Sequence, residues 1–235
     1  MLALALLACA PPELPPPPPR ATKAELKGYR APDLVIRSND ASLEDLSAGW
    51  WRWVLAFPRS TSPVSDMTGQ RCADGQRDDV WFLVGPQGAD ASRTCSIPEN
   101  KTILIPALNC ASPTGGCMNE LSALQYKVLL DGTEQLPLMQ EATIVHGDAV
   151  ADNPFTAQND AHAIDIVAEG AWVRLQPLSG GEHTLVINIT GAYTYAVTYT
   201  LTVAGAPAAT TTGTPATTTT GSSTSSSKAP AASGG

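Results

Sequence analysis

The sequence predicts a mainly β protein, an antiparallel β-sandwich of the jelly-roll or immunoglobulin-like kind with one tryptophan-rich helix packed on it. Three observations lead to this fold class. About eight short apolar runs are separated by residues typical of turns, such as Asp131-Gly132. The last two runs, His183–Ile189 and Tyr193–Val203, alternate apolar and polar residues, as strands with one buried face do. The stretch 42–57 repeats with the period of a helix instead.

The composition divides the 235 residues into four parts. An apolar leader (1–9) is followed by a proline-rich spacer (10–27), the β-sandwich domain (28–205) and a Thr/Ser-rich tail (206–235) that we expect to be disordered. The domain contains 10 Lys and Arg against 20 Asp and Glu, so its net charge is −10, while that of the whole chain is −8. This charge argues against nucleic acid as a partner, because it repels phosphate.

The leader predicts export. Leu2–Ala8 is an apolar run of seven residues, far shorter than the roughly 20 residues of a membrane-spanning helix but long enough for the core of a signal peptide. Leu6-Leu7-Ala8-Cys9 resembles the bacterial lipobox, in which the cysteine receives the lipid. We therefore expect an extracytoplasmic lipoprotein, at the outer membrane or cell surface, anchored to the membrane through Cys9. The alternative is cleavage after Ala8-Cys9-Ala10, which would give a secreted protein.

The helix is predicted from its first turn and its apolar stripe. Ser42 and Asp45 resemble a capping box, and Pro58 ends the helical pattern. The stripe indicates that the helix lies on the core through two of its tryptophans, while Trp51 lies near the rim, where it could contact a ligand. The residues of the stripe are Leu43, Leu46, Trp50, Trp53 and Phe57.

The strands are predicted from apolar or alternating runs that end at turn residues. The first is a continuous apolar run that stops at Gly85-Pro86, which indicates a buried strand. In chain order, the predicted strands are Val80–Val84, Thr102–Ile105, Tyr126–Leu130, Ala142–Val145, Ile164–Val167, Ala171–Leu175, His183–Ile189 and Tyr193–Val203.

Four cysteines of the domain predict two disulfide bonds. Four cysteines allow three pairings, of which the simplest is Cys72 with Cys95 and Cys110 with Cys117. Metal binding is the alternative, but the spacings of 23, 15 and 7 residues match no common zinc pattern. Disulfides agree with an exported protein.

A set of short motifs resembles a family of secreted bacterial proteins without an established activity. The motifs are Trp50-Trp51-x-Trp53, Asp66-x-Thr68-Gly69-x-x-Cys72, Val80-Trp81-Phe82-Leu83 and Arg93-x-Cys95-x-Ile97-Pro98. The resemblance covers most of the domain, and it implies export and a single intact domain. It implies no chemistry. The chain departs from the family pattern at Pro86, where a small residue usually follows the glycine.

Acidic residues between the helix and the first strand are candidates for a ligand surface. Asp66, Asp74, Asp78 and Asp79 lie close together in the sequence, and calcium prefers carboxylate and carbonyl oxygens. The order of these residues does not reproduce an EF-hand, so we expect no cofactor other than a candidate calcium ion, and a solvated turn is the simpler interpretation. Trp51 is included in the same candidate surface.

Catalytic motifs are weak. His146, His162 and His183 lie far apart in the sequence, without a serine or cysteine nucleophile in a recognisable elbow. Glycoside hydrolysis requires only two suitably spaced carboxylates, and Asp78, Asp79 and Glu99 are the nearest candidates.

The sequence therefore favours a non-enzymatic binding or structural module of the cell surface. Its predicted partners are the membrane, through the lipid, and a glycan or an envelope protein. The alternative function is a carbohydrate-active hydrolase that uses a carboxylate pair beside the Cys72–Cys95 loop.

Overall fold

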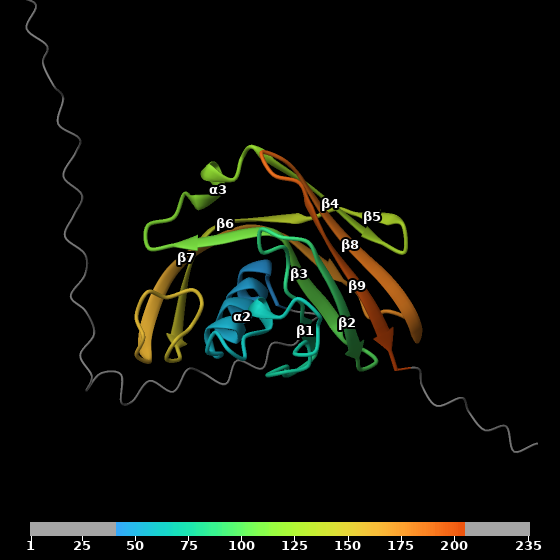
Figure 1. Ribbon diagram of the computed structural model, residues 1–235, viewed down its shortest axis with the longest axis horizontal. Coiled ribbons are helices and arrows are strands. Elements are labelled where there is room, and N and C mark those ends of the chain that lie inside the picture. Colours follow the sequence, from blue (N-terminus) through green and yellow to red (C-terminus); the bar gives the residue numbers. More distant parts are fainter. Residues whose placement is uncertain (1–40, 205–235) are drawn as a thin grey trace, which may run out of the picture.

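The computed structural model describes residues 41–204. Cys9, the leader, the spacer and the tail lie outside the described residues, as do residues 28–40 and 205 of the predicted domain. Within the described range two sheets are stacked, and a helix packs on one of them (Figure 1). No helix in this part of the chain is long and apolar enough to cross a membrane.

The elements follow one another with short connections, except between α2 and β1 and between β6 and β7. In chain order they are α2 (Leu43–Leu55), a 3-10 turn (Pro63–Ser65), β1 (Val80–Phe82), β2 (Ala91–Ile97), β3 (Thr102–Ser112), α3 (Cys117–Glu120), β4 (Leu124–Leu130), β5 (Thr133–Gln135), β6 (Leu138–Ala149), β7 (His162–Leu175), β8 (Gly181–Gly191) and β9 (Tyr195–Val203).

The two sheets form the predicted sandwich. One has the strand order β1-β3-β7-β6 and the other has the order β2-β9-β8-β4-β5. Apolar side chains from both sheets fill the space between them, among them Ile105, Val173, Leu185 and Leu201. Most neighbouring strands are antiparallel, as predicted, but β1 pairs with β3 and β2 pairs with β9 in parallel. Each parallel pair lies at a sheet edge, where the chain crosses between the sheets before it returns.

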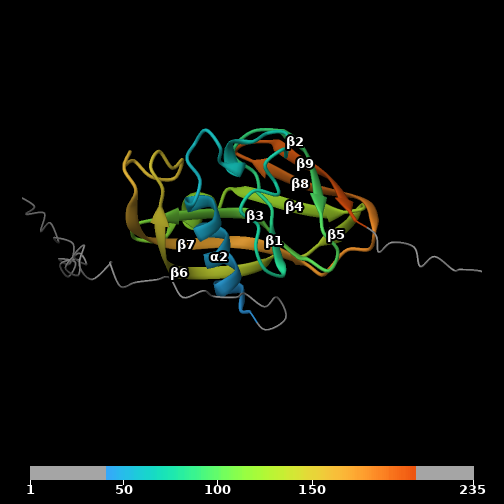
Figure 2. The same ribbon diagram turned by 90° about the horizontal axis from the view of Figure 1, so that it is seen from below.

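Helix α2 begins at the predicted capping box. The hydroxyl of Ser42 accepts a hydrogen bond from the Asp45 amide at 3.1 Å, and the Asp45 carboxylate accepts one from the Ser42 amide at 3.3 Å. The apolar side of α2 lies on the four-stranded sheet, where the rings of Trp50 and Trp172 are 5.5 Å apart. Figure 2 shows α2 crossing this sheet. The protein therefore has three layers, with an apolar core on each side of the four-stranded sheet.

Strand β2 is an addition to the predicted set. Its residues alternate between buried and exposed, as a strand with one buried face requires. The buried positions are Ala91, Arg93, Cys95 and Ile97, of which only Ile97 is large and aliphatic. Because the charged residue Arg93 occupies one of the buried positions, the sequence does not show the alternation of apolar and polar residues that would predict this strand.

Strand β7 is one element of 14 residues, where the sequence predicts two strands with Gly170 between them. Gly170 lies inside the strand because its neighbours come very close. A Cβ atom there would lie 2.9 Å from the Asn109 Cβ and from the Leu108 carbonyl oxygen, distances that Cβ atoms do not adopt. The glycine permits close packing and does not mark a turn.

The two predicted disulfide bonds are present. Cys72–Cys95 connects the segment after α2 to β2, and Cys110–Cys117 closes the loop between β3 and α3. Bridges that close loops of these lengths stabilise a domain by about 2–4 kcal/mol each, chiefly by restricting the unfolded chain.

Candidate functional site

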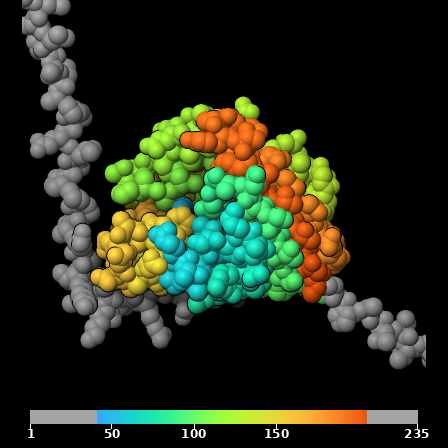
Figure 3. Space-filling view, in the orientation of Figure 1, coloured from blue at the N-terminus to red at the C-terminus, as the bar shows by residue number. Residues whose placement is uncertain are grey.

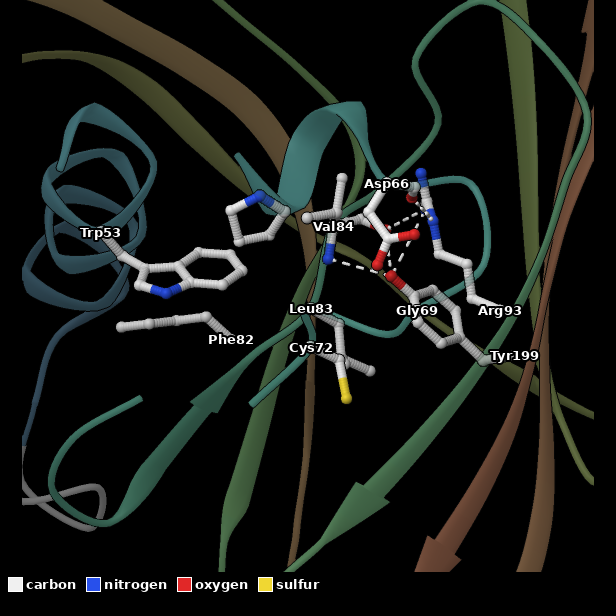
Figure 4. A pocket seen from close by; sticks show the side chains of 10 residues that line it. Trp53, Asp66, Gly69, Cys72, Phe82, Leu83, Val84, Arg93 and Tyr199 are labelled. Atoms are coloured by element: carbon white, nitrogen blue, oxygen red, sulfur yellow. Dashed lines mark hydrogen bonds between the residues drawn. The ribbon is translucent and has the colours of Figure 1, made fainter. Parts of the chain in front are cut away.

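Arg93 holds together segments that are far apart in the sequence, and only 2% of its surface is exposed. Its Nε donates to the Asp66 carbonyl at 2.9 Å. Its Nη1 donates to the carbonyls of Val84 at 2.9 Å and Gly85 at 3.3 Å. The Tyr199 hydroxyl lies 3.3 Å from Nη1 and donates to the Val84 carbonyl at 2.9 Å (Figure 4). One guanidinium thus joins the loop before β1, the chain after β1, and β2 and β9.

A cavity of about 10 Å³ lies beside this cluster, lined also by Trp53 and Phe82. This is about the volume that one water molecule requires. The second terminal nitrogen of Arg93, Nη2, is buried and has no hydrogen-bond partner among the described residues. Burial raises the pKa of Tyr199, so its hydroxyl stays protonated beside the cation. The cluster is therefore suited to hold the fold together, and its cavity is too small for an organic substrate.

Asp66 organises the loop that reaches Arg93. Its carboxylate accepts hydrogen bonds from the Thr68 amide at 2.8 Å, the Thr68 hydroxyl at 2.7 Å and the Arg71 amide at 2.8 Å. Partial burial raises the pKa of Asp66, but these hydrogen bonds together outweigh it and hold the pKa below 3.8. This segment between α2 and β1, cyan in Figure 3, covers the middle of the face in view.

Trp51 does not lie at the rim, so that prediction is wrong. Only 3% of its surface is exposed, and its ring packs edge-on against Phe155 with centroids 5.3 Å apart. Trp50 and Trp53 are also buried, as predicted. The tryptophan side of α2 therefore offers no stacking platform for a sugar.

The remaining predicted ligand residues serve the loop in other ways. The Asp74 carboxylate lies 3.4 Å from Arg71 in an exposed ion pair. Asp78 accepts a hydrogen bond from Lys101 through its backbone carbonyl, and the Asp79 carbonyl accepts one from the first amide of β3. These carboxylates do not converge on one point with Asp66 in the described chain.

One group of three potential metal-ligating side chains comes together between residues 41 and 204. It consists of Cys110, Cys117 and Glu169, whose ligand atoms lie within 4.8 Å of one another. The two cysteines are bonded to each other. The buried carboxylate of Glu169 accepts hydrogen bonds from the amides of Gly116 and Met118, on either side of Cys117. Glu169 thereby positions the loop that carries the disulfide.

His183 lies between a carboxylate and a serine, an arrangement that resembles a catalytic triad in composition. Its Nδ1 is 2.7 Å from the Asp131 carboxylate, and its Nε2 is 2.9 Å from the Ser179 carbonyl and 3.4 Å from the Ser179 hydroxyl. Both nitrogens face acceptors, an arrangement that favours the protonated imidazolium, and the hydrogen bonds to Asp131 and Ser179 raise the pKa of His183. A general base needs an unprotonated Nε2. The contact between Asp131 and His183 therefore connects the β4–β5 turn to β8.

The charged pair of His183 and Asp131 predicts a dependence of stability on pH. The hydrogen bond between them holds the pKa of His183 above 6.5 and that of Asp131 below 3.8. The stabilisation by His183 is complete below pH 6.5 and is lost as the pH rises through the folded-state pKa. The stabilisation by Asp131 is complete above pH 3.8 and is lost as the pH falls through the lower folded-state pKa of this carboxyl group.

We expect His183→Gln to flatten the decrease in the free energy of unfolding as the pH rises above 6.5. The difference is at most about 1 kcal/mol, because Asp131 is half exposed and water screens the pair. Urea unfolding at each pH measures it. His162→Gln is the control, since the His162 ring contacts the nearby Asp160 carbonyl and forms no ion pair with a carboxylate in residues 41–204. Equal pH profiles for the parent and His183→Gln would contradict the expectation.

Exposed apolar side chains gather along β6. We define the β6 surface as the outer edge of β6 together with Leu136, Leu138, Met139 and Ile144. Their exposed fractions are 83%, 52%, 58% and 61%. β6 is the last strand of its sheet, and the described chain places no strand on its outer side. An unpaired edge with this many apolar side chains is a ready surface for strand pairing.

The charge around the β6 surface has one sign. Residues 128–173, which contain β5, β6 and most of β7, include eight Asp and Glu but no Lys or Arg. Three of the acidic residues, Glu134, Glu141 and Asp148, lie on β5 and β6 and are exposed. The surface therefore combines apolar contact area with negative charge.

The fold and these sites define a disulfide-linked, two-sheet sandwich covered on one side by a tryptophan-rich helix. No family model matches the chain, and neither does any curated protein. Among solved structures it is similar to the cysteine protease inhibitor EhICP2 from Entamoeba histolytica, with 14% identity and a TM-score of 0.26. The alignment covers 53% of this chain and 94% of the inhibitor. So distant a likeness carries no inference about function.

Proposed function

We propose that this chain is an exported, lipid-anchored binding module without catalytic activity, whose β6 surface binds an extended, basic and apolar segment of another envelope protein. The exposed apolar residues on the unpaired, acidic edge of β6 carry the proposal. An edge strand binds an incoming strand through main-chain hydrogen bonds, and the side chains on either side provide selectivity. The surrounding carboxylates favour a partner with lysine or arginine.

The contacts of the polar side chains support a binding role. Asp66, Glu169 and His183, which resemble catalytic groups in type, each hold a loop or turn through hydrogen bonds. No observation favours the carboxylate-pair hydrolase.

Export and anchoring are a separate part of the proposal. Two disulfide bonds are consistent with an oxidising compartment, and the resemblance to secreted bacterial proteins implies the same setting. We expect the protein purified from its native host to carry a diacylglycerol on Cys9, which intact-mass measurement detects. Cys9→Ser should release the protein from the membrane fraction. An unmodified Cys9 would contradict the anchor but not the binding function.

A defined peptide tests the binding function. We expect full-length protein to bind an octapeptide of alternating Lys and Val more tightly than one of alternating Glu and Val, with an affinity that falls as salt is added. Ile144→Lys should weaken the binding by about tenfold or more, because it places a cation on the apolar part of the edge. Fluorescence anisotropy of labelled peptides measures both effects.

The control replaces an equally exposed residue elsewhere. Tyr193 is 69% exposed and lies in the turn between β8 and β9, so Tyr193→Lys makes the same change in charge away from β6. It should leave the peptide affinity unchanged. Equal binding of the two peptides, or equal effects of the two substitutions, would overturn the proposed site.

A further inference from the structure

We propose that residues 30–37 of this same chain lie along β6 and form an additional, antiparallel edge strand that an external partner displaces. The inference concerns the regulation of the β6 surface and so rests on the proposed function for its meaning. The docking itself follows from charge, apolar pattern and the path of the chain.

The charge of the segment before α2 complements that of β6. Residues 20–37 contain five Lys and Arg but only two acidic residues, whereas residues 128–173 contain eight acidic residues and no Lys or Arg. The segment therefore has a net positive charge, opposite to the negative charge around the β6 surface. Opposite charges favour pairing of the basic segment with the acidic β6 surface, whereas an acidic segment would be repelled.

The apolar pattern also fits an edge strand. Residues 30–37 read Arg-Ala-Pro-Asp-Leu-Val-Ile-Arg, so Leu34, Val35 and Ile36 form an apolar, partly β-branched run followed directly by Arg37. Pro32 precedes the run, and proline is tolerated at the start of an edge strand. Such a strand places side chains alternately on both faces, where β6 exposes Leu138 on one face and Met139 on the other.

The path of the chain brings the segment within reach of β6. The Ala41 carbonyl accepts a hydrogen bond from Arg174 at 3.4 Å, and Arg174 lies two residues beyond Trp172, which is paired with Leu138 at the start of β6. In Figure 2 the first turn of α2 lies beside the outermost strand, β6. The five residues from Ile36 to Ala41 span up to about 17 Å. Strand β6 begins near Ala41 and runs away from it. A segment that runs along β6 toward Ala41 is therefore antiparallel to β6.

The extent of the open edge agrees with the length of the segment. Arg52 of α2 donates to the His146 carbonyl at 3.0 Å, so α2 itself reaches the distal half of β6. The open part is Leu138–Val145, eight residues, like the proposed segment.

Amide hydrogen exchange on the full chain tests the docking. We compare the parent with the double variant Leu34→Asp, Ile36→Asp, which adds charge to the apolar run. In the parent, the outward amides of residues 138–145 should be protected, and in the variant they should exchange about tenfold faster or more. Leu26→Asp is the matched control, because it makes the same kind of change outside the proposed strand. It should leave the exchange of β6 as in the parent.

Two further readouts separate the occupants of the surface. The protection should not depend on protein concentration, since the segment belongs to the same chain; protection that grows with concentration would assign the site to a second copy and overturn the inference. The double variant should also bind the Lys-Val octapeptide about tenfold more tightly than the parent, because the site is no longer occupied.

The outcomes distinguish the two proposals. If β6 exchanges equally in the parent and the double variant, docking of residues 30–37 is wrong, whether or not the peptide binds. If the exchange responds but the peptide binds no variant, the docking stands and the proposed binding function is wrong.

Discussion

Replacing Arg93 with alanine should lower the free energy of unfolding by about 3–5 kcal/mol. The substitution removes the donors to the carbonyls of Asp66, Val84 and Gly85, and it leaves a cavity where the side chain was. Burying the guanidinium costs free energy, but leaving the carbonyls of Asp66 and Gly85 without this donor costs more than its removal returns, while the Val84 carbonyl keeps the hydrogen bond from Tyr199. Urea unfolding with the disulfides intact measures the change.

Arg93→Met separates the hydrogen bonds from the packing. Methionine fills much of the same volume but donates nothing, so this variant should still lose about 2 kcal/mol or more. Arg93→Lys keeps the charge but not the planar fork, and we expect an intermediate loss. A methionine variant as stable as the parent would show that the guanidinium does not hold these segments together.

Replacing Trp50 with alanine should have a similar effect, about 3–5 kcal/mol. Trp50 is completely buried and contacts the rings of Trp51, Trp53 and Trp172 at centroid distances of 5.1, 6.3 and 5.5 Å. Its indole nitrogen donates to the Leu83 carbonyl at 2.8 Å. The helix is attached to the sheet largely through this side chain, so the loss should appear in denaturant unfolding as a lower midpoint.

Trp50→Phe divides this loss into two parts. Phenylalanine retains an aromatic ring but not the donor, so the Leu83 carbonyl remains buried without its partner, at a cost of about 1–3 kcal/mol. The rest of the alanine effect then measures packing. If Trp50→Ala unfolds at the same denaturant concentration as the parent, α2 is not an integral layer of the fold.

Local patterns predicted α2 and the disulfides well because their signals lie within short stretches. Ser42 and Asp45 are three residues apart and form the capping box that starts the helix. Cys110 and Cys117 close a short loop, so their pairing needs little knowledge of the rest of the chain. The strands with clear alternation, β8 and β9, are confirmed for the same reason.

The candidate site could not be predicted in the same way, because its contacts join distant parts of the chain. Arg93 reads as an exposed position until its acceptors, 8 and 27 residues away, are known. Trp51 reads as a rim residue because Phe155, which covers it, comes from the loop after β6. The β6 surface depends on strand order, which alternation within one strand does not determine. The run of residues 128–173 without Lys or Arg was visible in the sequence and could have directed attention to β6.

The parallel pairing of β2 with β9 sets an order of folding. Ala91 pairs with Val197 and Ile97 with Val203, so β2 acquires its strand partner only when the last strand of the domain has been made. Contacts between such distant residues slow folding, because a long loop must close before they form. A chain that is still being synthesised lacks β9 and cannot complete the five-stranded sheet, whereas the strands of the four-stranded sheet all precede β8. The core between the two sheets therefore closes last, at the carboxyl end of the domain.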